Sequence, residues 1–329
     1  MGYSTSFSLI VGGLGLFLFA LFALSDEMKK ITYSAKFKKV ILSITNNKFE
    51  SFFIGVLFTA LIQSSSCSSI LFLNLVESNM MTTLSCISAI IGANIGTCIT
   101  AFLVSFSSIS VSKIMPYLLF LFAFILILYK KKNVQQLCKI LLLFNLIFFA
   151  ILVIDVNVKN IFFVQEKSSI LNFLNFLFSS SILGFLFGLV VTAIFQSSSI
   201  VIAILQVVCG TFGLHNVSFV NVFPIIIGAN VGAIMPLLLM SINKTMAVKK
   251  ITYINFFIKT MTAMFFMILL FLLGDVMKNM TINIDIMFQI ALIHVLFNCF
   301  EALIFFPIIK KLDVLSTIFL EKIYKNKNN

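Results

Sequence analysis

Two Gln-Ser-Ser-Ser tetrapeptides hold the polar side chains best suited to binding chemistry in this chain of 329 residues. They comprise Gln63, Ser64, Ser65 and Ser66 in the first half and Gln196, Ser197, Ser198 and Ser199 in the second. Both interrupt long apolar stretches, so each predicts a polar turn between two half-helices. The N–H groups and hydroxyls at such a turn suit an anion. Hydroxyl, amide and freed backbone carbonyl oxygens suit a hard cation such as sodium.

The tetrapeptides are part of a longer duplication. The phrase G-V-L-F-T-A-L-I-Q-S-S-S at 55–66 returns as G-L-V-V-T-A-I-F-Q-S-S-S at 188–199. A second phrase follows each copy, as G-A-N-I-G at 92–96 and as G-A-N-V-G at 228–232. Two shared phrases in the same order indicate an internal repeat.

The composition places the chain in a membrane. Hydrophobic residues make up 60% of it and charged residues 10%, which leaves too little polar surface for a soluble domain. We expect one membrane domain over 1–329, without a soluble catalytic module, and a first apolar run that is retained as a helix. Apolar runs long enough to cross about 30 Å of hydrocarbon lie at 5–24, 52–76, 84–106, 114–129, 137–154, 182–208, 217–241, 251–273 and 286–309.

The lysines predict the orientation. The formal charge of +12 indicates a positive-inside topology in such a chain, not nucleic-acid binding. Residues 25–50 carry six lysines and the matching stretch 155–181 only two, and the bias reverses after the G-A-N phrases. Equivalent loops therefore lie on opposite sides of the membrane. We expect cytoplasmic loops at 25–50, 130–136 and 243–250, outside loops near 107–113, 155–170 and 274–285, an outside N-terminus and a cytoplasmic tail.

Counting crossings then predicts the fold. The chain is inside at residue 50 and outside at residue 110, yet two apolar runs lie between, and two full crossings would return it to the inside. One of the two runs must therefore be re-entrant. The run 52–76 is the candidate, because polar residues interrupt it at 63–69. The predicted fold is an all-α multi-pass membrane protein with two inverted-topology repeats, each with a re-entrant helical hairpin that carries a QSSS motif. The repeats cover about 52–154 and about 182–273, followed by a final helix at about 286–309 and a Lys-rich tail at 310–329.

Packing is the alternative for each motif. Serine clusters and the glycines of the G-A-N phrases also allow close helix crossings, and those glycines could permit a second backbone break. Asn94 and Asn230 need partners because their amides are expected to be buried.

The duplicated phrases resemble the sodium/phosphate cotransporter family, whose bacterial members and animal type II relatives share two Q-S-S-S repeats, each followed by G-[AT]-N-I-G-T. Further similarity lies in G-L-G-L-F-L-F-A at 13–20 and Q-I-A-L-I-H-V-L-F-N at 289–298. The resemblance implies that both tetrapeptides line the phosphate and sodium sites. The implied sodium ligands are Thr59, Gln63, Ser64, Asn94, Thr97, Thr100, Thr192, Gln196, Ser197 and Asn230.

This chain departs from the family pattern in repeat two. Ala233 and Pro236 stand where hydroxyl residues are expected, which puts one sodium site in doubt. We also expect no C-terminal regulatory domain of the kind that many bacterial relatives carry.

A second polar group lies deep in the apolar runs. His294, Asn298 and Glu301 share one helix face, and Lys259 lies within the 251–273 run. Intramembrane ionisable residues are candidates for function. A structural ion pair between Lys259 and Glu301 is the preferred interpretation. His294 is interpreted as a hydrogen-bonded packing residue, with a proton site as the alternative.

The expected function is sodium-coupled transport of inorganic phosphate across the cytoplasmic membrane by alternating access. The chain has no arginine, so co-bound cations would neutralise the anion. The partners are phosphate, sodium and the lipid bilayer, with no cofactor, no metal besides sodium and no enzyme activity; a homodimer is left open. The alternatives are a phosphate exporter or other anion carrier of the same fold, an intramembrane serine hydrolase and a channel.

Overall fold

A computed structural model of the protein describes residues 3–32, 47–106, 114–128, 131–162, 168–211, 219–278 and 284–325. All regular structure in these ranges is α-helical, as predicted. The helices are α1 (Tyr3–Thr32), α3 (Lys48–Ile62), α4 (Ser65–Glu77), α5 (Thr83–Gly96), α6 (Cys98–Ser105), α7 (Met115–Leu128), α8 (Lys132–Phe162), α9 (Ser168–Ser179), α10 (Ser181–Phe195), α11 (Ser198–Thr211), α12 (Phe219–Gly232), α13 (Met235–Ser241), α14 (Met246–Lys278) and α15 (Ile286–Lys325).

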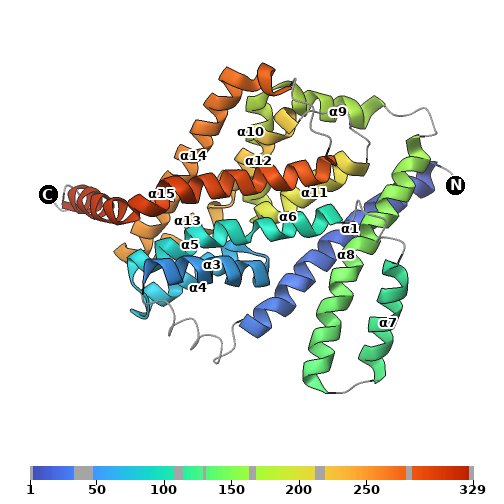
Figure 1. Ribbon diagram of the computed structural model, residues 1–329, viewed down its shortest axis with the longest axis horizontal. Coiled ribbons are helices and arrows are strands. Elements are labelled where there is room, and N and C mark those ends of the chain that lie inside the picture. The colour runs from blue at the N-terminus through green and yellow to red at the C-terminus, as the bar shows by residue number, and fades with distance from the viewer. Residues whose placement is uncertain are drawn as a thin grey trace.

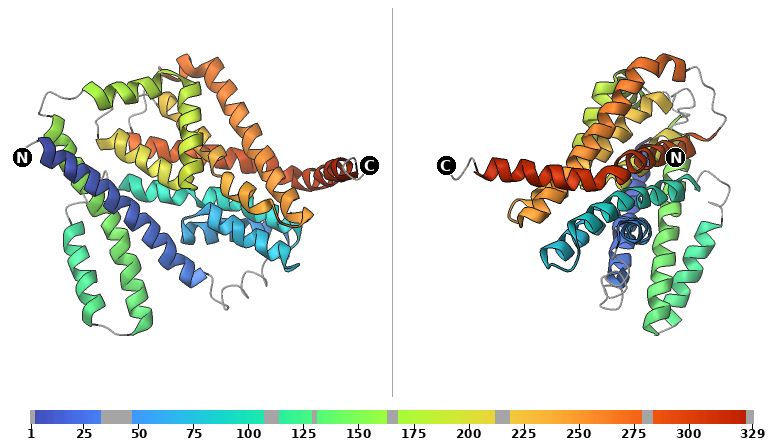
Figure 2. Two further views of the ribbon diagram at one scale, coloured as in Figure 1. Left: turned by 180° about the vertical axis from the view of Figure 1, so that it is seen from behind. Right: turned by 60° about the vertical axis from the view of Figure 1, so that its left-hand side comes forward.

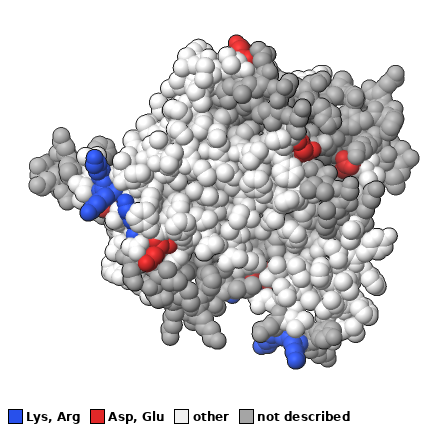
Figure 3. All heavy atoms as spheres, viewed as in Figure 1, with Lys and Arg blue, Asp and Glu red and all other residues white. Residues whose placement is uncertain are grey.

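Six stretches of the described residues are long and apolar enough to cross a membrane. Figure 3 shows a broad uncharged face, with the charged side chains at its margins. The short helix α7 corrects the prediction of a full span at 114–129, because its 14 residues rise only about 21 Å. The six spans are Thr5–Met28, Thr83–Ser105, Val134–Asn157, Val220–Ser241, Met246–Val276 and Ile286–Thr317.

The last helix passes through the middle of the molecule. In Figure 1, α15 runs between α3 to α6 on one side and α10 and α12 on the other, while α13 lies on the side of α4 and α5, and Figure 2 shows the central position of α15 from two further sides. The pair α1 and α8 packs beside this assembly, with α7 against α8. Helix α15 also joins the two hydrophobic cores, because Phe297 is buried in the core that contains α1, α8, α11 and α12, and Phe305 in the core of α3, α4, α5 and α14.

The helix breaks occur at the polar motifs. Helix α3 ends at Ile62, Gln63 adopts a left-handed conformation with φ 59°, and α4 begins at Ser65. The rings of Phe58 and Phe72 pack at 5.6 Å, which shows that α4 folds back on α3. The break is therefore shorter than the predicted 63–69, because Ser65 and Ser66 already belong to the first turn of α4.

Several helices are longer than the apolar runs predict. Helix α8 continues through residue 162 and α9 begins at Ser168, where an outside loop at 155–170 was expected. Helix α9 then meets α10 at a bend of 108°, which is the one sharply bent pair with membrane-like composition in the described ranges. The expected final helix at 286–309 continues to Lys325. The Lys-rich stretch 33–46 and the expected loop 107–113 lie outside the described residues.

Candidate functional site

The two Gln-Ser-Ser-Ser breaks meet in space. Ser66 Oγ donates a hydrogen bond to the backbone carbonyl of Gln196 at 3.1 Å, although the two residues are 130 positions apart. The two glutamines have nearly the same backbone conformation, with φ and ψ of 59° and 26° at Gln63 and of 56° and 23° at Gln196. A left-handed conformation is unfavourable for a residue with a Cβ. Because both glutamines adopt this conformation, we infer that the fold requires a sharp turn between the two helices at each break.

A cavity of about 210 Å³ lies between the two breaks. That volume is far more than the roughly 10–15 Å³ that one water requires. Helix α1 contributes Ser25 to its wall, α6 contributes Thr100 and α13 contributes Pro236. The predicted site residues in the wall are Gln63, Ser64, Ser66, Thr100, Gln196, Ser197 and Ser199.

The wall offers neutral hydrogen-bond donors rather than charges. Helices α4 and α11 begin at Ser65 and Ser198, directly after the two breaks, so their N-terminal N–H groups lie next to the cavity. Ser64 Oγ accepts the N–H of Cys67 at 3.3 Å. No Lys, Asp, Glu or His is among the described wall residues. Two helix N-termini with hydroxyl and amide donors form an environment that suits an anion.

Three threonine hydroxyls near the breaks have no hydrogen-bond partner in the described residues. Thr59 and Thr192 occupy equivalent positions in the two phrases, and both are 0% exposed. Neither hydroxyl donates to the preceding helical turn, and neither does that of Thr100. Thr97, in contrast, donates to the carbonyl of Ala93 at 2.9 Å. Buried hydroxyls are normally satisfied, so these three oxygens have unused hydrogen-bonding capacity, and of the three residues only Thr100 lines the cavity.

The shared glycines place the threonines. A Cβ at Gly55 would collide with the carbonyl oxygen of Ala89, and a Cβ at Gly188 would collide with that of Ile225. Helix α3 thus crosses α5, and α10 crosses α12, at backbone contact distance. A Cβ at Gly92 or Gly228 of the G-A-N phrases would likewise collide with a backbone carbonyl oxygen of α3 or α10, so the packing interpretation of these glycines is correct. Only a short interruption of the helix follows each G-A-N phrase, before α6 and before α13.

The ends of those phrases touch the same threonines. An added Cβ at Gly96 would come within 2.9 Å of Thr59 Cβ, and one at Gly232 within 3.0 Å of Thr192 Cβ. The glycines therefore bring the α5–α6 and α12–α13 breaks next to the unpaired hydroxyls.

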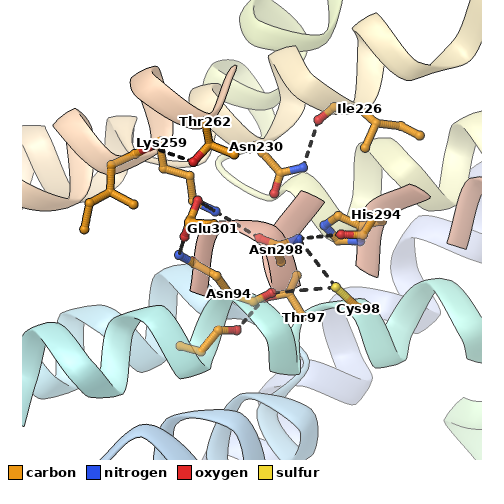
Figure 4. A network of polar contacts seen from close by, with 12 residues as sticks. Asn94, Thr97, Cys98, Ile226, Asn230, Lys259, Thr262, His294, Asn298 and Glu301 are labelled. Carbon is orange, nitrogen blue, oxygen red and sulfur yellow. Dashed lines mark hydrogen bonds and ion pairs between the residues drawn. The ribbon is translucent and has the colours of Figure 1, made fainter. Parts of the chain in front are cut away.

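A buried polar network joins α5, α14 and α15 (Figure 4). The predicted ion pair forms, with Lys259 Nζ 3.1 Å from Glu301 Oε2. Asn298 Oδ1 accepts from Lys259 Nζ at 3.0 Å, and Asn94 Nδ2 donates to Glu301 Oε1 at 2.7 Å. His294 does not match its interpretation as a hydrogen-bonded residue, because neither of its buried ring nitrogens has a partner among the described residues.

The two repeats differ at equivalent positions. Asn94 reaches across to Glu301, whereas Asn230 Nδ2 donates to the carbonyl of Ile226 in its own helix. Thr100 and Pro236 follow the two G-A-N phrases at the same distance, and both line the cavity. Proline supplies neither a hydroxyl nor an N–H, so the repeat-two side of the cavity lacks these groups.

Sequence reasoning missed the contribution of α1. Ser25 lines the cavity, and its hydroxyl donates to the carbonyl of Ile62 at the end of α3 at 3.2 Å. The only signal was the similarity of the first apolar run to the family's N-terminal helix, which assigns no role to a single serine. Ser65 and Ser198, in contrast, do not line the cavity.

Comparison with known proteins agrees with the resemblance. A family model described as Na+/Pi-cotransporter matches residues 16–155 and 163–298, two stretches that contain one tetrapeptide each. The uncharacterized protein YqeW of Bacillus subtilis (strain 168) is 24% identical over 294 residues, which cover 89% of this chain and 91% of that protein. No solved structure matches the chain. Because the family model spans most of its length, this chain belongs to the Na+/Pi-cotransporter family.

Proposed function

We propose that this protein carries inorganic phosphate across the cytoplasmic membrane together with sodium, by alternating access of two inverted repeats around the cavity between the breaks. The observation that carries the proposal is the contact between Ser66 and Gln196 at the edge of that cavity. One segment from each half of the chain contributes, which is the arrangement expected for a carrier whose halves move against each other. Membership of the Na+/Pi-cotransporter family supports the choice of both substrates.

Phosphate would bind to the neutral donors of the cavity. The N-termini of α4 and α11 supply N–H groups, and Ser64 and Ser199 supply hydroxyls, whereas the Ser66 hydroxyl already donates to Gln196. Such donors hold an oxyanion without cancelling its charge. Because the described wall has no cationic side chain, a cation that enters with the anion would lower the cost of removing it from water.

Sodium would bind beside the anion at the unpaired threonine oxygens. Thr59 and Thr100 belong to repeat one, and Thr192 to repeat two. Hard cations prefer such oxygen ligands. Repeat one would hold sodium more tightly, because Pro236 replaces in repeat two the hydroxyl that Thr100 provides.

The serine hydrolase alternative is less well supported by the same wall. A serine nucleophile needs an adjacent base, and the described wall residues include neither a histidine nor a carboxylate. The lack of a neighbouring base supports the proposed role of these serine hydroxyls as ligands rather than as nucleophiles.

Uptake of radiolabelled phosphate into proteoliposomes tests the proposal. We expect saturable uptake that requires an inward sodium gradient and that falls at least tenfold in Gln63→Ala and Gln196→Ala. Gln136→Ala, at the start of α8 and away from the cavity, is the matched control and should retain uptake. Flux that ignores the sodium gradient would refute sodium coupling. Net efflux under the same gradients would indicate an exporter, and single-channel currents a channel.

A further inference from the structure

The ammonium of Lys259 is surrounded by the kind of groups that bind a free cation. Its Nζ lies 3.1 Å from Glu301 Oε2 and 3.0 Å from Asn298 Oδ1. It also lies 5.5 Å from the centre of the Phe297 ring, within the range of a cation–π contact. The Lys259 and Glu301 side chains are 3% and 0% exposed, so the pair is closed off from water.

The oxygen ligands are held in place by other groups. Asn94 Nδ2 binds the second carboxylate oxygen of Glu301 at 2.7 Å. Asn298 Nδ2 donates to the carbonyl of His294 at 2.9 Å and lies 3.5 Å from Cys98 Sγ, which directs its Oδ1 toward Lys259 (Figure 4). Groups of α5 and α15 therefore hold the two oxygen ligands in position, whereas the cation that they bind comes from α14.

Stability alone does not account for this arrangement. Removing two charges from water costs about as much as their attraction returns, and apolar residues of similar volume often stabilise a core equally well or better. The network also touches the transport machinery. Asn94 belongs to the first G-A-N phrase, and Cys98 begins α6, the helix that carries Thr100 to the cavity.

We propose that Lys259 is a tethered cation, which occupies an intramembrane cation site formed by Glu301 and Asn298 and braced by Asn94. The ammonium neutralises Glu301 permanently, so no free ion is carried at this position. The consequence for transport rests on the proposed function: one cation of the transport cycle is supplied by the protein. The site itself does not depend on that function.

Replacing the lysine distinguishes two interpretations of the Lys259–Glu301 pair, a cation site and a simple ion pair. Lys259→Ala deletes the ammonium and opens a space next to the two oxygen ligands, in which a sodium ion can take its place. Lys259→Met also deletes the charge but refills most of the volume with an apolar chain. Both variants leave Glu301 without its partner, so both should unfold at a lower temperature than the wild type. Only the alanine variant should recover with sodium.

The experiment measures thermal unfolding of the purified full-length chain in detergent, in sodium chloride against choline chloride at equal ionic strength. The wild type shows how much sodium binding at the transport sites alone raises the unfolding temperature. We expect Lys259→Ala to show an additional sodium-dependent rise of about 4 °C when sodium is 100-fold above its dissociation constant. Lys259→Met should show only the wild-type response, and Lys259→Ala/Glu301→Gln should lose the additional rise. Equal sodium responses in all four proteins would overturn the proposal, as would a rise that persists in the double variant.

Poor folding of the alanine variant does not remove the test. Lys259→Gln keeps an oxygen ligand and most of the volume, and it can be extracted from membranes in sodium or in choline. A higher monodisperse yield in sodium supports the cation site, and equal yields overturn it. Phosphate uptake by the wild type is independent of these results, so its failure would refute the proposed function while leaving the cation site to the unfolding data.

Discussion

Replacing Thr59 by valine should show whether the Thr59 hydroxyl is a sodium ligand or only part of the packing. The Thr59 hydroxyl is 0% exposed and has no partner in the described residues. A buried hydroxyl without a partner costs about 1–3 kcal/mol. In sodium-free buffer, Thr59→Val removes that cost at nearly constant shape, so the free energy of unfolding should stay equal or rise by about 1 kcal/mol. If the oxygen binds sodium, its loss should weaken sodium binding by about 1–2 kcal/mol, which is roughly 5- to 30-fold in Kd.

The assay can use the cysteines of the chain. The protein has no tryptophan, but Cys86, Cys98 and Cys209 are buried and become reactive on unfolding. A thiol-reactive dye therefore follows thermal unfolding, and titration with sodium at constant ionic strength gives the Kd from the shift in melting temperature.

A second buried threonine provides the control. Thr252 is also 0% exposed, but its Oγ1 donates to the carbonyl of Val248 at 3.0 Å. Thr252→Val should lower stability slightly and leave the sodium Kd unchanged. If Thr59→Val behaved in the same way, the threonine would be a packing residue and the assignment of a sodium ligand would be refuted.

Three further predictions concern the crossing, the cavity and the surface. Gly55→Ala should lower stability by more than about 2 kcal/mol because its Cβ meets backbone in α5, whereas Gly12→Ala, with open space around it, should not; similar melting temperatures would contradict the close crossing. Pro236→Thr should raise the Hill coefficient or affinity for sodium in phosphate uptake, and an unchanged sodium dependence would exclude position 236 from the site. The pKa of Glu77 lies below its ordinary 4.5, mainly because the Thr245 hydroxyl donates to the carboxylate. The stabilisation that this carboxylate provides is present above pH 4.5 and is lost as the pH falls through the lowered pKa, so the melting temperatures of wild type and Glu77→Gln should converge below pH 4.5.

The local rules of the sequence anticipated the character of the chain and its break points. Apolar runs interrupted by Gln63 and Gln196 predict helices that stop at these residues, because polar side chains and freed backbone groups need partners that lipid cannot provide. The glycines of the two G-A-N phrases predicted close crossings, and Gly92 and Gly228 make them. The inverted orientation of the repeats stays a prediction.

Only the tertiary structure decided which distant groups meet. The contact of Ser66 with Gln196 and the bond of Asn94 to Glu301 join residues 130 and 207 positions apart. Neither follows from helix periodicity, which determines the face on which a side chain lies but not the helix that packs against it. The packing of α15 against α5 and α14 decides the second of these contacts, and it also brings Glu301 to Lys259. Burial in the low-dielectric interior then favours each such pairing, since a polar group left unpaired there costs more than one exposed to water.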